Sequence, residues 1–110
     1  MKKTYRIKKE IEFRQIMEQK RSFANRNFII YIKERQKDHF RIGLSVGKKV
    51  GNAVVRNYIK RQIRETVMSL QAEMSHEFDI IIIARPNVTS LSFQEVQRNL
   101  SHVFKLANIL

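Results

Sequence analysis

Four consecutive isoleucines in the segment "DIIIIA" (79–84) constrain the fold of this 110-residue chain more than any other feature. A strand with one face in water alternates apolar and polar residues, and this segment does not alternate. It is also far shorter than the roughly 20 apolar residues that a transmembrane helix needs. The segment therefore predicts a strand that ends before Pro86 and is covered on both faces, which requires helices packed against the sheet.

Two earlier segments, 26–33 and 40–46, predict strands that each have one apolar face. Apolar residues occupy alternate positions in both, namely Phe28, Ile30 and Ile32, then Phe40, Ile42, Leu44 and Val46. The polar link "ERQKDH" between the two segments predicts an antiparallel hairpin. The opposite faces carry Tyr31, Lys33, Arg41, Gly43 and Ser45. Such a mixed face suits either solvent or a platform for nucleotides.

Three segments have helical periodicity. Residues 9–20 place Phe13, Ile16 and Met17 at helical spacing, and a long helix follows residue 52. Ser92 and Glu95 form a capping-box pattern before a final apolar stripe, which consists of Val96, Leu100, Val103, Phe104 and Ala107. The order is helix, two or three strands, helix, strand, helix. It predicts an α+β fold, an α/β sandwich with helices packed on a mixed, mostly antiparallel sheet, in a single domain spanning 1–110.

Positive charge is concentrated in the first part of the chain. Residues 1–64 hold 19 Lys and Arg against 5 Asp and Glu, whereas residues 65–110 hold 3 against 5. Such an excess repels itself unless an anion neutralises it, so a polyanionic partner is favoured over a merely solvated surface. Nucleic acid is the first expectation, and an anionic membrane surface is the second.

The absence of cysteine excludes disulfides, a thiol nucleophile and a thiolate metal site. The N-terminus "MKKTYRIKKEIEFRQ" begins with cations but lacks the apolar stretch of a secretory signal. We therefore expect a cytoplasmic protein that does not span a membrane.

The long helix carries two stripes of different chemistry. Five apolar residues recur at intervals of 4, 4, 4 and 3, and these residues are Val55, Ile59, Ile63, Val67 and Leu70. They predict a face buried in the core. Arg56, Lys60 and Arg64 each follow a core residue by one position, so they lie about 100° further around the helix.

Nearby polar residues extend this cationic row. Asn57 and Arg61 lie one step further around the helix, and Asn52 is the expected N-cap, with Gly51 allowing the turn into it. Lys48 and Lys49 precede the helix N-terminus, whose free N–H groups favour anions. Glu65 is the only acid in residues 50–70, so intrahelical salt bridges do not explain the row. Together these groups predict an anion-binding surface.

The sequence offers no pattern for a protein active site. The acids of residues 1–64 lie on separate charged segments, and the three histidines (His39, His76 and His102) are isolated from one another. A two-metal nuclease would need several converging carboxylates. The lysines between Gly47 and Gly51 do not match the spacing of a phosphate-binding loop, in which lysine follows the second glycine. We expect no catalytic residues and no metal ligands in the protein.

The segment "SVGKKVGNAVVRNYIKRQIRE" resembles the signature of the protein component of bacterial ribonuclease P. The resemblance extends over nearly the whole chain. The segment "RIKKEIEFRQIM" is similar to the first helix of that family, "SFANRNFIIYI" to its next strands, and "DIIIIARP" to its last strand. It implies the element order αβββαβα and an unusual left-handed βαβ crossover that leads into the arginine-rich helix.

The resemblance also implies a function. Proteins of this family bind a large catalytic RNA, which removes the 5′ leader of precursor tRNA and which supplies the chemistry, with Mg²⁺ bound through the RNA. The contacts to catalytic RNA would come from the matching positions Lys48, Lys49, Asn52, Arg56, Asn57, Lys60, Arg61 and Arg64. The leader would bind beside the first helix, at Phe13, Met17 and Tyr31, because every base has a face that can stack on an aromatic ring.

Some alternatives stay open at this stage. Tyr58 stands where the family often has a third basic residue and would either stack on a base or cover the helix flank. Met17 stands where an aromatic residue is common and would either contact a base or fill the core. The rival functions are a structural RNA-binding protein of the ribosomal type and a peripheral protein of anionic membranes. Whether the holoenzyme forms a dimer is also open.

Overall fold

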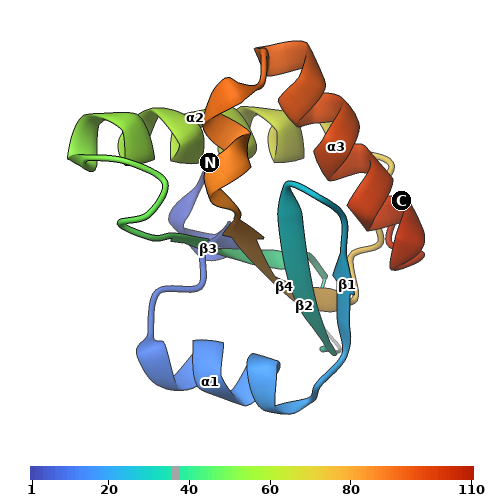
Figure 1. The fold of residues 1–110 in the computed structure, drawn as a ribbon. Helices are drawn as coiled ribbons and strands as arrows, with labels where there is room; N and C mark the ends of the chain where they lie inside the picture. The colour runs from blue at the N-terminus through green and yellow to red at the C-terminus, as the bar shows by residue number, and fades with distance from the viewer. Residues whose placement is uncertain (36–37) are drawn as a thin grey trace.

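The computed structural model describes residues 1–35 and 38–110. In this part of the chain, helices lie on both faces of a four-stranded sheet (Figure 1). The elements are α1 (Glu10–Glu18), β1 (Ser22–Ala24), β2 (Phe28–Glu34), β3 (Arg41–Val46), α2 (Ala53–Leu70), β4 (Phe78–Ala84) and α3 (Phe93–Leu106), with short 3₁₀ turns η1 (Lys3–Tyr5) and η2 (Pro86–Ser90). This order confirms the predicted α+β class and the sequence αβββαβα. Helices α2 and α3 cover one face of the sheet, and α1 covers the other.

The isoleucine-rich strand β4 lies inside the sheet, whose strand order is β1-β2-β4-β3. It pairs antiparallel with β2 and parallel with β3. Ile80, Ile81 and Ile82 have no exposed surface. The predicted coverage of both faces is therefore confirmed, and so is the mixed, mostly antiparallel character of the sheet.

The predicted antiparallel hairpin between residues 26–33 and 40–46 is wrong, because β4 lies between these two strands. Ile82 of β4 is in register with Ile30 of β2 and with Leu44 of β3. A strand that is apolar on both faces is best buried with a neighbour on each side, whereas β2 and β3 each have a mixed face. Gln36 and Lys37, in the predicted link, lie outside the described residues.

Strands β3 and β4 are neighbouring parallel strands joined through α2, which is the expected βαβ crossover. Its left-handed sense stays a prediction from the family resemblance. Helix α2 begins at Ala53, shortly after β3 ends at Val46, so the turn with Lys48 and Lys49 leads directly into the helix that carries the cationic row.

The main core lies between the sheet and the pair α2 and α3. Ile59, Ile63 and Val67 of α2 are buried there, as predicted for the apolar stripe, and so are Val96, Leu100, Val103 and Phe104 of α3. A smaller cluster on the opposite face contains Ile7, Ile16 and Ile81, with Phe13, Tyr31 and Ile83 packed against it.

Both predicted helix starts are confirmed. Asn52 Oδ1 accepts a hydrogen bond from the Val55 N–H at 3.0 Å. Ser92 Oγ accepts one from the Glu95 N–H at 3.2 Å, and Glu95 Oε1 accepts one from the Ser92 N–H at 3.0 Å, which completes the capping box. Across residues 1–35 and 38–110, every helix is too short or too polar to cross a membrane.

Candidate nucleic-acid interface

The cationic row of α2 lies directly beside the buried apolar stripe of the same helix. Burial of Ile59 and Ile63 fixes the rotation of the helix. Arg56, Lys60 and Arg64 are consequently half-buried, while Asn57 and Arg61 point into solvent. The structure thus brings together the five α2 residues that the sequence predicted.

The N-terminal segment adds two cations that the sequence analysis did not assign to the site. The Ile7 N–H donates to the Ile42 carbonyl at 2.8 Å, and Arg6 forms a parallel bridge with Ile42, so this segment runs beside β3. Arg6 and Lys8 therefore line a cavity of about 120 Å³ together with Lys60 and Arg64 of α2. Two lines of positive charge face each other there.

A second, larger hollow adjoins the first. It has a volume of about 570 Å³ and is lined by Arg6, Arg61 and Arg64, together with Asn57, Glu65, Met1 and Met68. Arg6 and Arg64 line both hollows, so the two form one continuous basic depression between the N-terminal segment and α2.

The cations in this depression lack anionic partners. Among the described residues, none of Arg6, Lys60, Arg61 and Arg64 forms a salt bridge, and neither does Arg56, which lies on α2 outside the two hollows. Arg6 Nε and Arg56 Nε are buried without a hydrogen-bond acceptor in the described part of the chain. Burial, together with the charge of Arg6, lowers the pKa of the Arg64 guanidinium below its ordinary value. A bound phosphate would supply the missing negative charge and would accept from the accessible guanidinium and ammonium groups.

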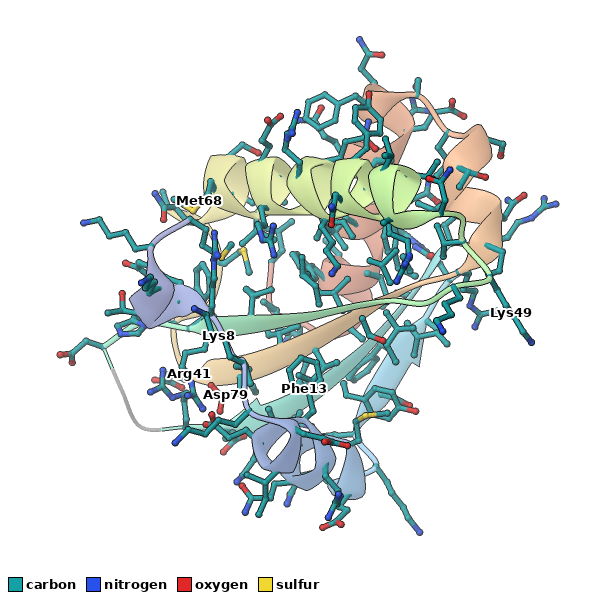
Figure 2. The ribbon with its side chains drawn as sticks, turned by 90° about the vertical axis from the view of Figure 1, so that its left-hand side faces the viewer. Lys8, Phe13, Arg41, Lys49, Met68 and Asp79 are labelled. Atoms are coloured by element: carbon teal, nitrogen blue, oxygen red, sulfur yellow. The ribbon has the colours of Figure 1, made fainter. Side chains whose placement is uncertain are left out.

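Lys48 and Lys49 lie in the turn between β3 and α2, and both are exposed. The Val50 N–H donates to the Gly47 carbonyl at 3.0 Å, and Val50 is buried, which fixes this turn against the core. Figure 2 shows Lys49 near the start of α2 and Lys8 below its other half. Asn52 uses its side-chain oxygen for the N-cap, which leaves its amide nitrogen to donate to a ligand. We call the basic surface the set formed by Arg6 and Lys8 together with the eight residues predicted to contact catalytic RNA, namely Lys48, Lys49, Asn52, Arg56, Asn57, Lys60, Arg61 and Arg64.

Phe13, Met17 and Tyr31, predicted for the leader, lie on the opposite side of the sheet; we call them the α1 face. Phe13 and Tyr31 pack against the same small cluster. A Cβ atom at Gly43 would lie 2.7 Å from Phe13 Cζ and 2.7 Å from Ile81 Cδ1, so only glycine lets Phe13 approach the sheet this closely. Met17 is 38% exposed, which excludes the core-filling alternative.

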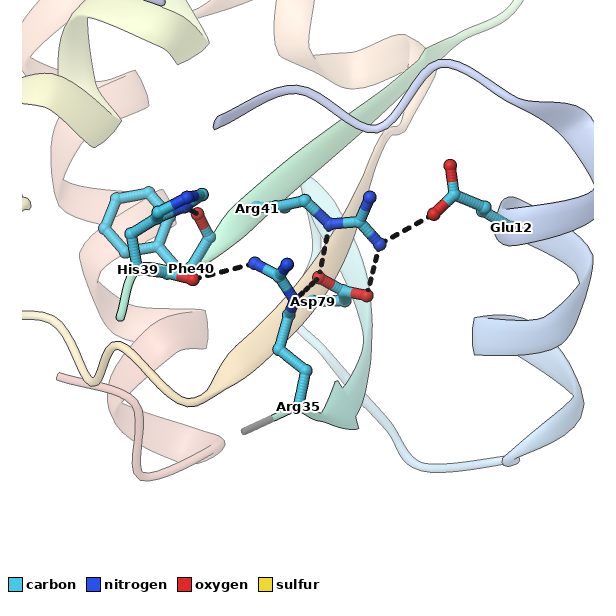
Figure 3. A network of polar contacts seen from close by, with 6 residues as sticks. All are labelled: Glu12, Arg35, His39, Phe40, Arg41 and Asp79. Carbon is cyan, nitrogen blue, oxygen red and sulfur yellow. Dashed lines mark hydrogen bonds and ion pairs between the residues drawn. The ribbon is translucent and has the colours of Figure 1, made fainter. Parts of the chain in front are cut away.

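An ion network ties α1 to the sheet (Figure 3). Arg41 donates from Nε to Asp79 Oδ1 at 2.9 Å and from Nη2 to Asp79 Oδ2 at 2.8 Å, and Nη2 also pairs with Glu12 Oε2 at 2.7 Å. Arg35 Nε lies 3.3 Å from Asp79 Oδ1. The hydrogen bond to Asp79 above all, and that to Glu12, raise the pKa of Arg41 further above its ordinary value.

This network changes the interpretation of the mixed sheet face. The sequence placed Arg41 on a possible nucleotide platform, but two carboxylates already neutralise its guanidinium. Asp79, which is 5% exposed, is likewise bound by two arginines. In residues 1–35 and 38–110, no three His, Asp or Glu side chains lie close enough together to hold a metal ion.

Comparisons with known proteins match nearly the whole chain. The family model described as Ribonuclease P matches residues 1–108. The ribonuclease P protein component of Enterococcus faecalis is 54% identical over all of this chain and 94% of its own length. A mutant Staphylococcus aureus RNase P protein with defective mRNA degradation activity has a similar structure, with a TM-score of 0.90 and 44% identity over 98% of this chain and 92% of its own.

The likeness persists at lower identity. The RNase P protein from Thermotoga maritima is 27% identical and has a TM-score of 0.85, covering 92% of this chain and 96% of its own. The match of the family model over nearly the whole chain and the identity to these relatives lead to one conclusion: the chain belongs to the family of ribonuclease P protein components.

Proposed function

We propose that this protein is the protein subunit of a ribonuclease P ribonucleoprotein, which binds the catalytic RNA and the 5′ leader of precursor tRNA and assists removal of the leader. Membership of the family supports a role in such a complex. The observation that carries the RNA contact is the basic surface, where cations of α2 and of the N-terminal segment face one another without anionic partners among the described residues.

The chemistry of cleavage is assigned to the RNA subunit, with Mg²⁺ bound through RNA. The protein would act by electrostatics and by positioning. Its cations neutralise phosphates that magnesium ions would otherwise have to neutralise, so the protein should lower the Mg²⁺ concentration that cleavage requires. The α1 face would stack on unpaired leader bases, with Phe13 and Tyr31 held in place by the cluster around Ile81.

The test is cleavage of a precursor tRNA by a bacterial ribonuclease P RNA at low Mg²⁺, with and without the protein. We expect the protein to restore accurate removal of the leader. Binding to the RNA without any effect on cleavage would instead support a structural RNA-binding protein of the ribosomal type. Flotation with anionic liposomes tests the third class, a peripheral membrane protein.

Variants separate the two proposed surfaces. Arg61→Ala and Arg64→Ala should weaken assembly with the catalytic RNA, whereas Phe13→Ala and Tyr31→Ala should weaken mainly the binding of substrate that carries a leader. Lys105→Ala is the matched control, because it removes an exposed cation on α3, away from both surfaces. Equal losses from all four variants in both assays would contradict the division into two surfaces.

A further inference from the structure

A third cavity, different in character from the two basic hollows, lies on the side of α2 opposite the cationic row. It has a volume of about 380 Å³, within the range of roughly 300–1,000 Å³ that is typical of small-molecule sites. Val54, Tyr58 and Gln62 of α2 line one side, and Thr89 and Leu91 line the other. The η2 segment that supplies the second side lies against α2 (Figure 1). Tyr58 is 55% exposed, so its ring is available to a ligand.

Gln62 is the unusual residue of this cavity. The residue is only 6% exposed, and Oε1 has no hydrogen-bond partner among the described residues. Leaving a buried acceptor unpaired is unfavourable, and native proteins rarely do so without a reason. Thr66 Oγ1 donates to the Gln62 backbone carbonyl at 2.9 Å, so it does not satisfy the side chain. The cavity is therefore mostly apolar, and Gln62 in its wall holds an acceptor without a donor, which a turn of the side-chain amide would present to a ligand.

We propose that this cavity binds one unpaired nucleobase that carries an exocyclic amino group, with its ring against Tyr58 and its amino group donating to Gln62 Oε1. The inference rests on the proposed function, because it requires RNA to follow α2. Tyr58 and Arg61 are three residues apart on the helix and therefore neighbours on its surface. A phosphate held by Arg61 brings the adjacent base within reach of the cavity. Tyrosine stacks on any base, while the acceptor selects those with an amino group.

The surrounding charge favours RNA over a protein partner. The solvent-exposed face of α2 next to the cavity carries Asn57 and Arg61, and the face beyond it, on the side away from the cavity, carries Arg56, Lys60 and Arg64. A segment of another protein would have to lie beside this row of cations while offering a donor to Gln62. A nucleotide satisfies both requirements with one group, because its phosphate and its base are joined.

The first experiment uses short oligonucleotides, so that its result does not depend on ribonuclease P activity. We would follow the Tyr58 ring and Gln62 side-chain amide signals by NMR during titration with three single-stranded pentamers. These contain adenine, purine without the amino group, or no base, and all have the same phosphate charge. The adenine pentamer should shift both signals, the purine pentamer chiefly that of Tyr58, and the abasic pentamer neither. Equal shifts from the adenine and abasic pentamers, or no shift with adenine, would overturn the proposal.

The second experiment uses variants of the full chain. Gln62→Met removes the unpaired acceptor at similar volume, so the melting temperature of the free protein should rise. The affinity for RNA should nevertheless fall about five- to tenfold, the size of one hydrogen bond. Tyr58→Ala should also lower this affinity, whereas Tyr58→Phe keeps the ring and should not. Leu106→Ala, which removes another exposed apolar side chain, is the control.

Measuring the affinity of these variants separately for the catalytic RNA and for precursor tRNA identifies which RNA supplies the base. A loss of affinity for the catalytic RNA alone assigns the base to that RNA, and a loss only with precursor tRNA assigns it to the substrate. Unchanged affinity in both arms for Gln62→Met and Tyr58→Ala would overturn the proposal and leave Gln62 a structural residue. Failure of the wild-type protein to assist cleavage would count against the proposed function alone, since the pentamer titration is independent of it.

Discussion

Gly43 shows how one missing side chain shapes the α1 face. A Cβ atom there would overlap both Phe13 and Ile81. Gly43→Ala should displace Phe13 and destabilise the protein by about 1–3 kcal/mol, the usual effect of overpacking. It should also weaken binding of leader-bearing substrate. Urea unfolding checks the first effect. Gly47→Ala is the control, because a Cβ at Gly47 has no neighbour within 4 Å; equal destabilisation by both would contradict the argument.

Asp79 is the residue on which the ion network depends. It is buried and binds both Arg35 and Arg41, so Asp79→Asn leaves two guanidinium groups without their shared anion. Breaking a buried pair in this way should reduce the free energy of unfolding by about 3–5 kcal/mol. Glu34→Gln breaks the exposed pair between Arg21 and Glu34 and should change stability by less than about 1 kcal/mol. Similar effects of the two variants in urea unfolding would contradict the assigned role.

At the scale of elements, the start of α3 offers a prediction about stability. Ser92→Ala removes the N-cap acceptor and should destabilise the protein by about 1 kcal/mol. Thermal unfolding at neutral pH measures this effect. Thr89→Ala, in the preceding η2 turn, is the comparison, because its hydroxyl donates only to the nearby Pro86 carbonyl. A loss for Thr89→Ala as large as that for Ser92→Ala would argue against a special role of the cap.

The other half of the capping box predicts that stability depends on pH. Hydrogen bonds from the backbone and side chain of Ser92 lower the pKa of Glu95 below its ordinary value. A group with a lowered folded-state pKa contributes stability above its unfolded pKa, about 4.3, and loses it as pH falls through the folded value. The wild-type protein should therefore lose more stability in acid, below about pH 4, than Glu95→Gln. Parallel pH curves for melting of the two proteins would contradict this.

The elements also show what sequence can and cannot predict. The caps at Asn52 and Ser92 were predictable because their partners lie three residues away. The separation of β2 from β3 was not, because β4, which lies between them, comes after α2 in the chain. Arg6 was missed for the same reason: its neighbour Arg64 is distant in sequence, and only the bridge between Arg6 and Ile42 brings the two together. The charge excess of residues 1–64 predicted a basic surface, but it did not show that Arg6 and Lys8 of the N-terminal segment belong to it.

At the scale of the whole molecule, the two proposed RNA surfaces lie on different sides of the sheet, with α2 on one face and α1 on the other (Figure 1). The cations of the basic surface form no salt bridge within the described part of the chain, whereas the α1 face consists of apolar and aromatic side chains beside an ion network whose arginines are already neutralised. Under the proposed function we therefore expect phosphate contacts at the first surface and stacking of leader bases at the second. This division makes the two surfaces respond differently to salt.

The salt dependence of RNA binding provides the test of that division. Each phosphate contacted on a single strand lowers the logarithm of the binding constant by about 0.7 per tenfold rise in salt. Arg61→Ala removes one cation from the basic surface, so the slope against salt should fall by about one such contact. Phe13→Ala should lower affinity for leader-bearing RNA at every salt concentration and leave the slope unchanged, because stacking releases no counterions. Filter binding over a series of salt concentrations measures both. A change of slope with Phe13→Ala, or none with Arg61→Ala, would show that charge and stacking are not divided between the two faces.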